Sequence, residues 1–379
     1  MTEAEQITVH KSPLDEMHKR FGALLRERDG WSLPASYGDQ LFEYGAVREA
    51  GAGVIDLSPS GRFQVSGSEA VQFLNGLITN DMKTLEENCW MPAAFPNVQG
   101  RLIASVRVIR KPDDATGKKP VPTFLIDTEV ATREAVLKTM ERFTLAGDFH
   151  VVDLTSQTAL LSLQGKRAVD VIGSVLGESA PGRATYGVAQ MEWGQESVTV
   201  LRASHTAEDG FDVVVSADQA NFLWGAFVNA GARPVGYEAW DILRIEAGVP
   251  RYGIDMDETN VVTETGLDEA VSYTKGCYIG QEIIARIKYR GHVAKKLVGL
   301  FFDRPVKIDN NAKITAADAK EIGRITSYTL SPHLGRTIAL GYVKYDYLAP
   351  DTEVKVTSTH GDVQARVAEL PFVRGSAPY

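Results

Sequence analysis

A change of pattern near Lys295 is the feature that most restricts how this chain can fold. Before it, strand-like and helix-like stretches alternate. After it, short apolar strands follow one another closely, at 297–302, 314–315, 323–329, 339–343, 353–358 and 364–367. Short strands at such spacing are typical of a β-sandwich or barrel. We therefore predict that the chain ends in a separate all-β module.

The residues before this change predict two α+β units. Residues 60–155 run strand, helix, two strands, helix, strand, which is the split pattern of a ferredoxin-like unit. A second unit starts with a strand at 159–163 and includes helices at 218–230 and 237–247. The N-terminal stretch to about residue 30, which precedes both units, predicts a charged amphipathic helix or arm. The Pro/Gly/Ser-punctuated stretch 31–38 predicts a loop, and Ser68 is the expected N-cap of a helix that ends at 77.

Composition excludes several classes of protein. The 379 residues suffice for two or three domains, and the net charge of -9 argues against a nucleic-acid partner. No uncharged apolar run approaches the roughly 18 residues of a membrane span, and residues 1–28 lack the apolar core of a secretory signal. Cys89 and Cys277 cannot form a disulfide framework. We expect a cytoplasmic protein without a membrane partner, and without a metal site because no Cys/His cluster has zinc-site spacing.

The stretch Lys275–Glu282, KGCYIGQE, combines a cysteine with two glycines just before a helical pattern. Ile283, Ile284 and Ile287 lie on one helical face, so Cys277 precedes a helix N-terminus and stands two residues from Lys275. Both features favour a thiolate. The alternative is a buried cysteine that only packs in a tight turn.

Three other places carry chemistry-bearing side chains. Arg244 lies near the end of a predicted helix and could be a planar donor for a carboxylate or heterocycle, or part of a solvated salt bridge. Asp212 follows a turn at the start of a strand, where an acid is either solvated or an acceptor for an aminopyrimidine. Asn97, in the stretch 94–101, suggests a tight turn or a polar pocket wall.

Taken together, these stretches resemble the folate-binding superfamily of the glycine-cleavage T-protein. The resemblance runs from about Tyr37 to the C-terminus and rests on HTAEDGFDVVV at 205–215 and LRIEAGVPRYGIDMDE at 243–258. KGCYIGQE is more specific and resembles the signature of the YgfZ-type branch, whose members bind tetrahydrofolate and support iron–sulfur enzymes.

The resemblance implies a three-domain ring around a central folate pocket. Its α+β class would comprise two interleaved α+β domains, one of them ferredoxin-like, and a C-terminal antiparallel β-barrel. The expected division is 1–58 with 156–290 for the interleaved folate-binding domain, 59–155 for the ferredoxin-like domain, and 291–379 for the barrel.

The resemblance also implies a set of site residues. Cys277 would carry the chemistry, and tetrahydrofolate or a one-carbon derivative would be the cofactor. Arg244 and Asp212 would lie by the pteridine. The remaining residues expected around the folate are Tyr252, Asn97, Lys275, Gly276, Tyr278, Gly280, Gln281 and Glu282.

Two departures from the T-protein pattern bear on activity. The T-protein branch has a glutamate where this chain has Asp212, and an aspartate for methylene transfer where this chain has Ala104 or Ser105. Neither Ala104 nor Ser105 can act as an acid or base. The favoured hypothesis is therefore a tetrahydrofolate-binding accessory protein that supports iron–sulfur cluster assembly or repair through Cys277, with iron–sulfur client enzymes as partners. The alternatives are a folate-dependent aminomethyl or methyl transferase and a plain folate-binding module. A single thiol cannot hold a cluster, which usually takes four cysteine ligands.

Overall fold

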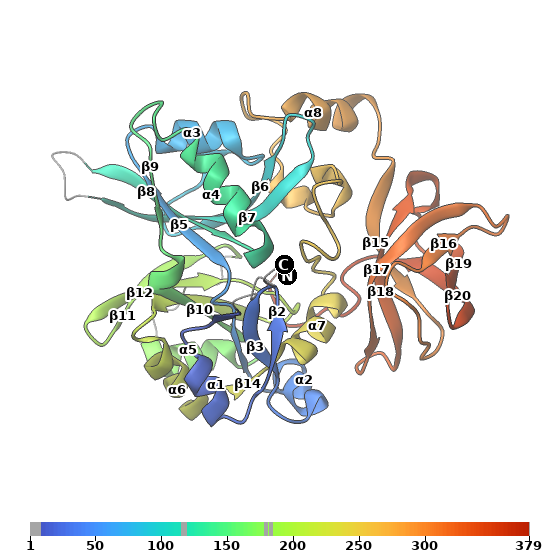
Figure 1. Cartoon of the computed structure of the whole chain (residues 1–379), viewed down its shortest axis with the longest axis horizontal. Helices are drawn as coiled ribbons and strands as arrows, with labels where there is room; N and C mark the ends of the chain where they lie inside the picture. The colour runs from blue at the N-terminus through green and yellow to red at the C-terminus, as the bar shows by residue number, and fades with distance from the viewer. Residues whose placement is uncertain (1–8, 115–119, 178–180, 182–184, 379) are drawn as a thin grey trace, which may run out of the picture.

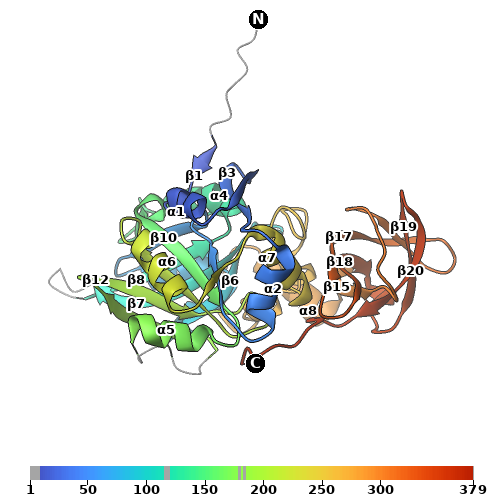
Figure 2. The same cartoon turned by 90° about the horizontal axis from the view of Figure 1, so that it is seen from below.

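A computed structural model describes residues 9–114, 120–177, 181 and 185–378. Three units surround the middle of the molecule, two of them sheets covered by helices and the third a barrel (Figure 1). Seen from below, the barrel again stands at one side of the two α+β units (Figure 2). The expected α+β class with a C-terminal antiparallel barrel is confirmed. No helix in these ranges combines the length and the apolarity that crossing a membrane requires.

The six-stranded unit has the strand order β11-β12-β13-β10-β4-β14. The chain leaves this sheet after β4 and returns at β10, its antiparallel neighbour, so the residues between them form an insertion. Alternate residues of β4 face opposite ways: Val54 packs with α5 and α6, and Ile55 packs with α2 and α7. The elements are α2 (Gln40–Arg48), β4 (Gly53–Asp56), β10 (Thr158–Gln164), α5 (Ala168–Leu176), β11 (Val188–Trp193), β12 (Glu196–Arg202), β13 (Gly210–Ser216), α6 (Ala220–Asn229), β14 (Arg233–Pro234) and α7 (Tyr237–Glu246).

The N-terminal segment corrects two expectations. In place of a long helix or arm followed by a loop, residues 10–36 form a three-stranded sheet with one short helix: β1 (His10–Lys11), α1 (Asp15–Arg20), β2 (Leu24–Arg28) and β3 (Trp31–Ser36). The cause is the turn Asp29-Gly30, whose φ angles of 53° and 79° are those of a two-residue hairpin. Residues 1–8 lie outside the described ranges.

The five-stranded unit is the insertion. Its sheet, in the order β6-β7-β8-β5-β9, is antiparallel throughout. The sheet has one strand more than the expected pattern of strand, helix, two strands, helix and strand. The additional strand is β6, an edge strand that was not predicted because Pro92 and Pro96 lie within it. Ser68 does not cap α3, because its hydroxyl donates to Asp148 instead. The elements are β5 (Gly61–Ser66), α3 (Ala70–Leu77), β6 (Trp90–Pro96), β7 (Leu102–Asp114), β8 (Val121–Thr128), α4 (Arg133–Glu141) and β9 (His150–Asp153). The hairpin tip expected at 111–120 falls mostly on residues 115–119, outside the described ranges.

The two sheets meet through a shared apolar layer. Ile109 and Leu125 of the five-stranded unit pack against Leu160 and Leu201 of the six-stranded unit, and all four are almost fully buried. This contact fixes the ends of β7 and β8 beside α7. The short 3₁₀ helices η1 (Met82–Thr84), η2 (Val130–Thr132), η3 (Thr155–Gln157), η4 (Val262–Glu264) and η5 (Asp268–Ala270) lie in the connections.

Helix α8 (Gln281–Arg290) belongs spatially to the five-stranded unit. Its fully buried Ile284 packs with Ala94 and Leu102 of β6 and β7. The expected division puts residues 281–290 in the interleaved domain, and Ile284 also packs with Met256, Val262 and Val271 of the segment after α7. Figure 1 shows α8 along the outer edge of the molecule, above β6 and β7.

The barrel closes in the order β15-β18-β17-β16-β19-β20, and all of its pairings are antiparallel. Each of its six strands had been predicted. Its elements are β15 (Lys295–Phe301), β16 (Lys313–Thr315), β17 (Glu321–Ser331), β18 (Arg336–Lys344), η6 (Tyr345–Tyr347), β19 (Glu353–Ser358) and β20 (Gly361–Ala368). The chain then returns to the six-stranded unit, where the Val373 N–H donates to Glu246 O at 3.1 Å and the Ala377 N–H donates to Ala207 O at 3.0 Å.

Candidate functional site

A cavity of about 270 Å³ lies where the two α+β units meet. It is close in size to the lower end of the range of about 300–1,000 Å³ that small-molecule sites occupy. Its walls come from the β2–β3 hairpin, the ends of β7 and β8, helix α7 and the segment after α7. The residues that line it are Arg28, Asp29, Leu33, Leu57, Pro59, Ser60, Ser105, Val106, Arg107, Asp127, Thr128, Glu129, Val130, Leu160, His205, Tyr237, Trp240, Arg244, Val249, Pro250, Arg251, Met256 and Leu267.

Helix α7 contributes an aromatic wall. Tyr237 and Trp240 both line the cavity, and the ring of His205 lies 5.3 Å from that of Trp240, centroid to centroid. The guanidinium of Arg28 stacks over Tyr237 at 4.3 Å, while its two Nη atoms donate to Asp241 at 3.0 and 3.1 Å. A wall of this kind suits a flat ring system, which gains both apolar contact and stacking.

A buried charged cluster forms another wall. Arg107 on β7 pairs with Asp127 on β8 and with Asp212 on β13, and His205 Nε2 lies 2.8 Å from Asp212 Oδ2. Burial opposes the ionisation of Asp212, but the charges of His205 and Arg107 outweigh it and hold the pKa of this carboxyl below its ordinary range. Asp127 Oδ1 is buried and has no hydrogen-bond partner among the described residues. Asp127 therefore keeps one acceptor oxygen for a ligand.

Asp212 itself does not line the cavity. It is fully buried behind Arg107 and His205, which do. The structure thus brings the expected acid to the site, but as a group that orients Arg107 and His205 in front of it.

Arg244 lines the cavity, yet its donors are occupied by protein. Its Nε donates to Asp241 at 2.8 Å, Nη1 donates to Asp255 at 2.8 Å and to Val249 O at 3.2 Å, and Nη2 donates to Ser327 of β17 at 3.0 Å. Asp255 also accepts from Thr326 of the barrel. The arginine expected to be a ligand donor is therefore first a buried link between α7, the segment after it and the barrel.

Ser105 of β7 and Glu129, the residue after β8, both line the cavity. The strands pair up to Val106 and Thr128, and Ser105 and Glu129 are the next residues along each. Ser105 lines the cavity, whereas Ala104 is fully buried in the core of the five-stranded unit. Of the two positions considered for the missing aspartate, Ser105 is the one that lines the cavity. Glu129 brings a carboxyl to the same place, and burial raises its pKa to about 7.

The other expected site residues lie away from the cavity lining. Asn97 holds a tight turn, with Oδ1 accepting from the N–H groups of Gln99 and Arg101 at 2.8 and 3.0 Å. Tyr252 packs with Tyr278 and Ile284 beneath α8, and its N–H reaches Glu129 Oε2 at 3.0 Å. Asn97 therefore shapes the β6–β7 connection, and Tyr252 contacts the site through a lining residue.

The stretch 275–282 forms part of the outer surface over α3 and α8. Lys275 Nζ donates to the carbonyl oxygens of Asn75, Ile78 and Asn80 at 2.7, 2.9 and 2.6 Å, so its ammonium is committed to the end of α3. Gly280 has a φ of 78° and lies against the turn at Asn97, whereas Gly276 has open space around it.

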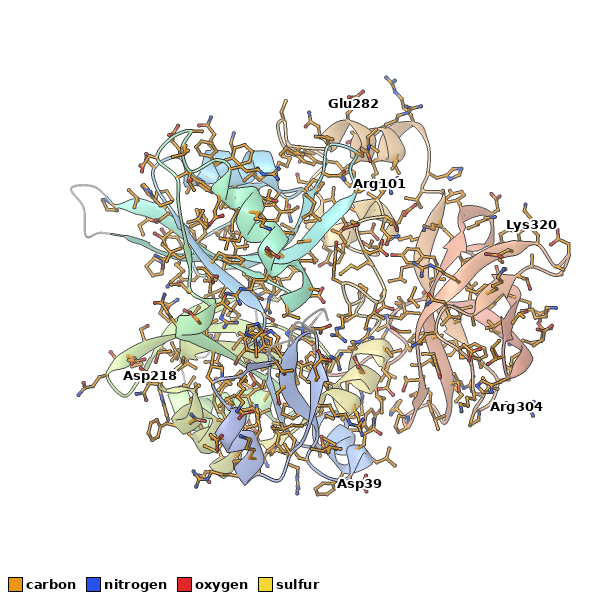
Figure 3. All side chains as sticks on the ribbon, in the orientation of Figure 1. Asp39, Arg101, Asp218, Glu282, Arg304 and Lys320 are labelled. Carbon is orange, nitrogen blue, oxygen red and sulfur yellow. The ribbon has the colours of Figure 1, made fainter. Side chains whose placement is uncertain are left out.

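The remaining members of this stretch also stay clear of the cavity. Gln281 accepts from the Tyr278 N–H at 3.2 Å. Figure 3 shows Glu282 at the outer edge of the molecule, directed away from its middle. None of the residues from Lys275 to Glu282 lines the cavity.

Cys277 is exposed, and its thiol makes no hydrogen bond or ion pair among the described residues. Helix α8 begins only at Gln281, and Lys275 is held elsewhere, so the two features expected to favour a thiolate act less directly than the sequence implied. The packing alternative is excluded by the exposure of the side chain. In the described part of the chain, no three His, Cys, Asp or Glu side chains are grouped to hold a metal ion.

The fold and the central cavity define the class of protein. The structure superposes on that of the glycine cleavage system aminomethyltransferase T from Bartonella henselae with a TM-score of 0.88, covering 98% of this chain and 100% of that one at 24% identity. The sequence matches the GCVT N-terminal domain over residues 14–275 and the glycine cleavage T-protein C-terminal barrel domain over 295–374.

Sequence relatives agree over nearly the whole chain. The aminomethyltransferase of Rubrobacter xylanophilus is 34% identical over 372 residues, which are 97% of this chain and 95% of that protein. That of Symbiobacterium thermophilum is 32% identical and covers 97% and 98%. The chain belongs to the glycine cleavage T-protein family of folate-dependent aminomethyltransferases, which confirms the expected superfamily. Tetrahydrofolate, the expected cofactor, is the one this family uses.

The sequence reasoning missed most of the lining. Asp127, Glu129 and His205 were not singled out, nor were Tyr237 and Trp240. A signal existed for Asp127 and Glu129, since they stand on either side of the last residue of β8, whose neighbour β7 carries the position of the missing aspartate. For the aromatic residues, the helical pattern of α7 does not tell which face meets a cavity and which meets the core.

Proposed function

We propose that this protein binds tetrahydrofolate or a one-carbon derivative in the central cavity and acts as an accessory protein of iron–sulfur cluster assembly or repair. The observation that carries the proposal is the pairing of a ligand-sized cavity with Ser105 where the family chemistry calls for a carboxylate.

The cavity residues fit a reduced pteridine. The ring is flat and presents adjacent N–H donors, for which a carboxylate is the matching acceptor. Asp127 Oδ1 is buried without a partner in the described part of the chain, and Tyr237 and Trp240 offer a stacking wall. Arg107 pairs with Asp127 and balances its charge. When bound, the cofactor would supply a one-carbon unit or a site for one, and these residues would hold and orient its ring.

The accessory role is supported by the absence of a carboxyl at position 105 and by the thiol outside the cavity. A serine hydroxyl at position 105 cannot take up or release a proton as a carboxyl does near neutral pH. Cys277 is exposed and unpartnered among the described residues, so it is free to contact a client or its cluster. The surrounding KGCYIGQE resembles the signature of the YgfZ-type branch, which supports the same role.

A folate-dependent aminomethyl or methyl transferase is the second candidate. Relatives named aminomethyltransferases align over nearly the entire chain. Glu129, beside Ser105, supplies a carboxyl to the same corner of the cavity. This candidate predicts turnover that depends on Glu129 and is indifferent to Cys277.

Two assays on the same purified protein and its variants separate the candidates. The first measures tetrahydrofolate-dependent release of ammonia from an aminomethylated carrier protein. The second measures the activity of an iron–sulfur enzyme in cells that lack this protein and carry the parent, Cys277→Ala or Cys89→Ala. We expect no ammonia release, and restoration by the parent and Cys89→Ala but not by Cys277→Ala.

The opposite pattern would overturn the accessory role. Robust ammonia release, with full restoration by a stably folded Cys277→Ala protein, would establish the transferase. Cys89 is a suitable control because it is half-buried and its pKa is raised by burial, so it is the less reactive thiol.

A further inference from the structure

Glu129 differs from the other carboxyl groups at the cavity in having no cation bound to it. Asp29 pairs with Arg251, and Asp127 pairs with Arg107, but Glu129 has no ion pair among the described residues. Its Oε2 accepts from the Tyr252 N–H at 3.0 Å, and its Oε1 has no hydrogen-bond partner in the same ranges. One oxygen is thus fixed by the backbone, and the other is left for whatever occupies the cavity.

The surroundings of Glu129 favour its neutral form more than usual. Burial raises its pKa to about 7, against the pull of the Tyr252 N–H and of the charges on Arg251 and Arg244, while the charge on Asp255 adds to the rise. Both arginines direct their donors at other carboxylates, so neither compensates the charge of Glu129 directly. The other charged or titratable groups that line the cavity are Arg28, Asp29, Arg107, Asp127, His205 and Tyr237.

A ligand in the cavity would change this balance further. It would displace water from Oε1, and loss of water disfavours the charged form of a carboxyl. The neutral acid has an O–H to donate, whereas the Asp127 carboxylate, which is paired with Arg107, accepts hydrogen bonds. Two carboxyl groups in different environments would then take opposite roles toward one ring.

We propose that Glu129 in its neutral form donates a hydrogen bond to the ligand of the central cavity, so that binding takes up a proton. The inference rests on the proposed function, because it assigns a contact to the tetrahydrofolate proposed to bind there. Donation requires an acceptor on the ligand, such as a ring carbonyl oxygen or ring nitrogen. Binding should therefore weaken as pH rises and Glu129 ionises.

Glutamine is the matched variant for this test. Its carbonyl oxygen can accept from the Tyr252 N–H, and its amide can donate where the neutral acid does, without titrating. Glu129→Ala removes both contacts. Glu134→Gln, on the exposed first turn of α4, is the control for loss of an acid outside the cavity.

The experiment is calorimetric titration of tetrahydrofolate from about pH 6 to about pH 8.5, in two buffers that differ in ionisation enthalpy. For the parent and Glu134→Gln we expect proton uptake on binding and a Kd that rises about tenfold across this range. For Glu129→Gln we expect the low-pH affinity with no comparable pH dependence, and for Glu129→Ala a weaker, flat affinity.

The outcomes separate this inference from the proposed function. Binding by the parent without proton uptake, or with the same pH profile in Glu129→Gln, would overturn the role of Glu129 and leave folate binding intact. Absence of binding by the parent at every pH would overturn the proposed function itself.

Discussion

Replacing Arg244 should cost stability before it costs affinity. Its guanidinium is buried and bonds two carboxylates, a carbonyl and a hydroxyl from three parts of the chain. Arg244→Ala would leave Asp255 buried with no cation, and removing one partner of a buried pair costs about 3–5 kcal/mol. We expect the variant to lose that much of its free energy of unfolding.

Arg28→Ala is the matched control. Arg28 also lines the cavity and binds Asp241, but its side chain is 18% exposed and Asp241 keeps Arg244 as a partner. Its loss should cost about 1 kcal/mol. Adding Asp255→Asn to Arg244→Ala should cost less than the sum of the two single changes by about 0.5–3 kcal/mol, because the orphaned charge is removed with its partner.

The measurement is urea unfolding followed by both circular dichroism and tryptophan fluorescence. Coincident transitions allow free energies to be compared between variants. If Arg244→Ala unfolds no more easily than Arg28→Ala, the guanidinium does not hold the units together. Loss of folate affinity with parental stability would instead support its originally expected role as a ligand donor.

Three further predictions test other parts of the structure. Gly280→Ala should lower the free energy of unfolding by more than about 1 kcal/mol, because it forces a side chain onto left-handed backbone and places Cβ 2.4 Å from a carbonyl oxygen. Gly276→Ala is the control and should not lower it, because no atom lies within 4 Å of the added Cβ. Equal melting temperatures of the two variants would refute this prediction. The folded state holds the Glu129 proton more tightly than the unfolded chain does. The stability that this proton contributes is therefore complete below about pH 4.3 and is lost as pH rises through about 7. The melting temperature of Glu129→Gln should rise relative to that of the parent between about pH 5 and pH 8, and a constant difference would contradict this prediction. Cys277→Ser should melt like the parent because the side chain is exposed, and Cys277 should be alkylated faster than Cys89 at neutral pH; a slower rate would argue against a reactive thiol.

Strong local patterns predicted most of the fold. The six barrel strands and the helices α6, α7 and α8 follow regular apolar spacing, which local sequence determines. The hairpin at Asp29-Gly30 could also have been predicted, since this dipeptide suits a two-residue turn. The charged residues on either side of it led instead to the prediction of a helix or arm. Strand β6 was concealed by prolines that an edge position tolerates.

The candidate site depended on packing that no local pattern contains. Whether Lys275–Glu282 lies at the cavity is decided by where Ile284 of α8 docks, and it docks on β6 and β7 at the outer surface. Likewise, Arg244 was found from its sequence context, but its occupied donors follow from contacts with a barrel strand about eighty residues away in sequence, at Ser327. The carboxyl of Glu129 stands beside Ser105 only because β7 and β8 are antiparallel neighbours.

The most direct test of the central claim is calorimetric titration of tetrahydrofolate into the parent, Val130→Trp and Val169→Trp. Val130 lines the cavity and is half-buried, so an indole there would fill the space of the ligand. Val169 lies on α5 with 43% of its surface exposed and controls for the substitution. With all three proteins melting alike, we predict one site per chain in the parent and Val169→Trp and none in Val130→Trp. Unchanged binding by Val130→Trp, or no binding by the parent, would contradict a folate site in the central cavity.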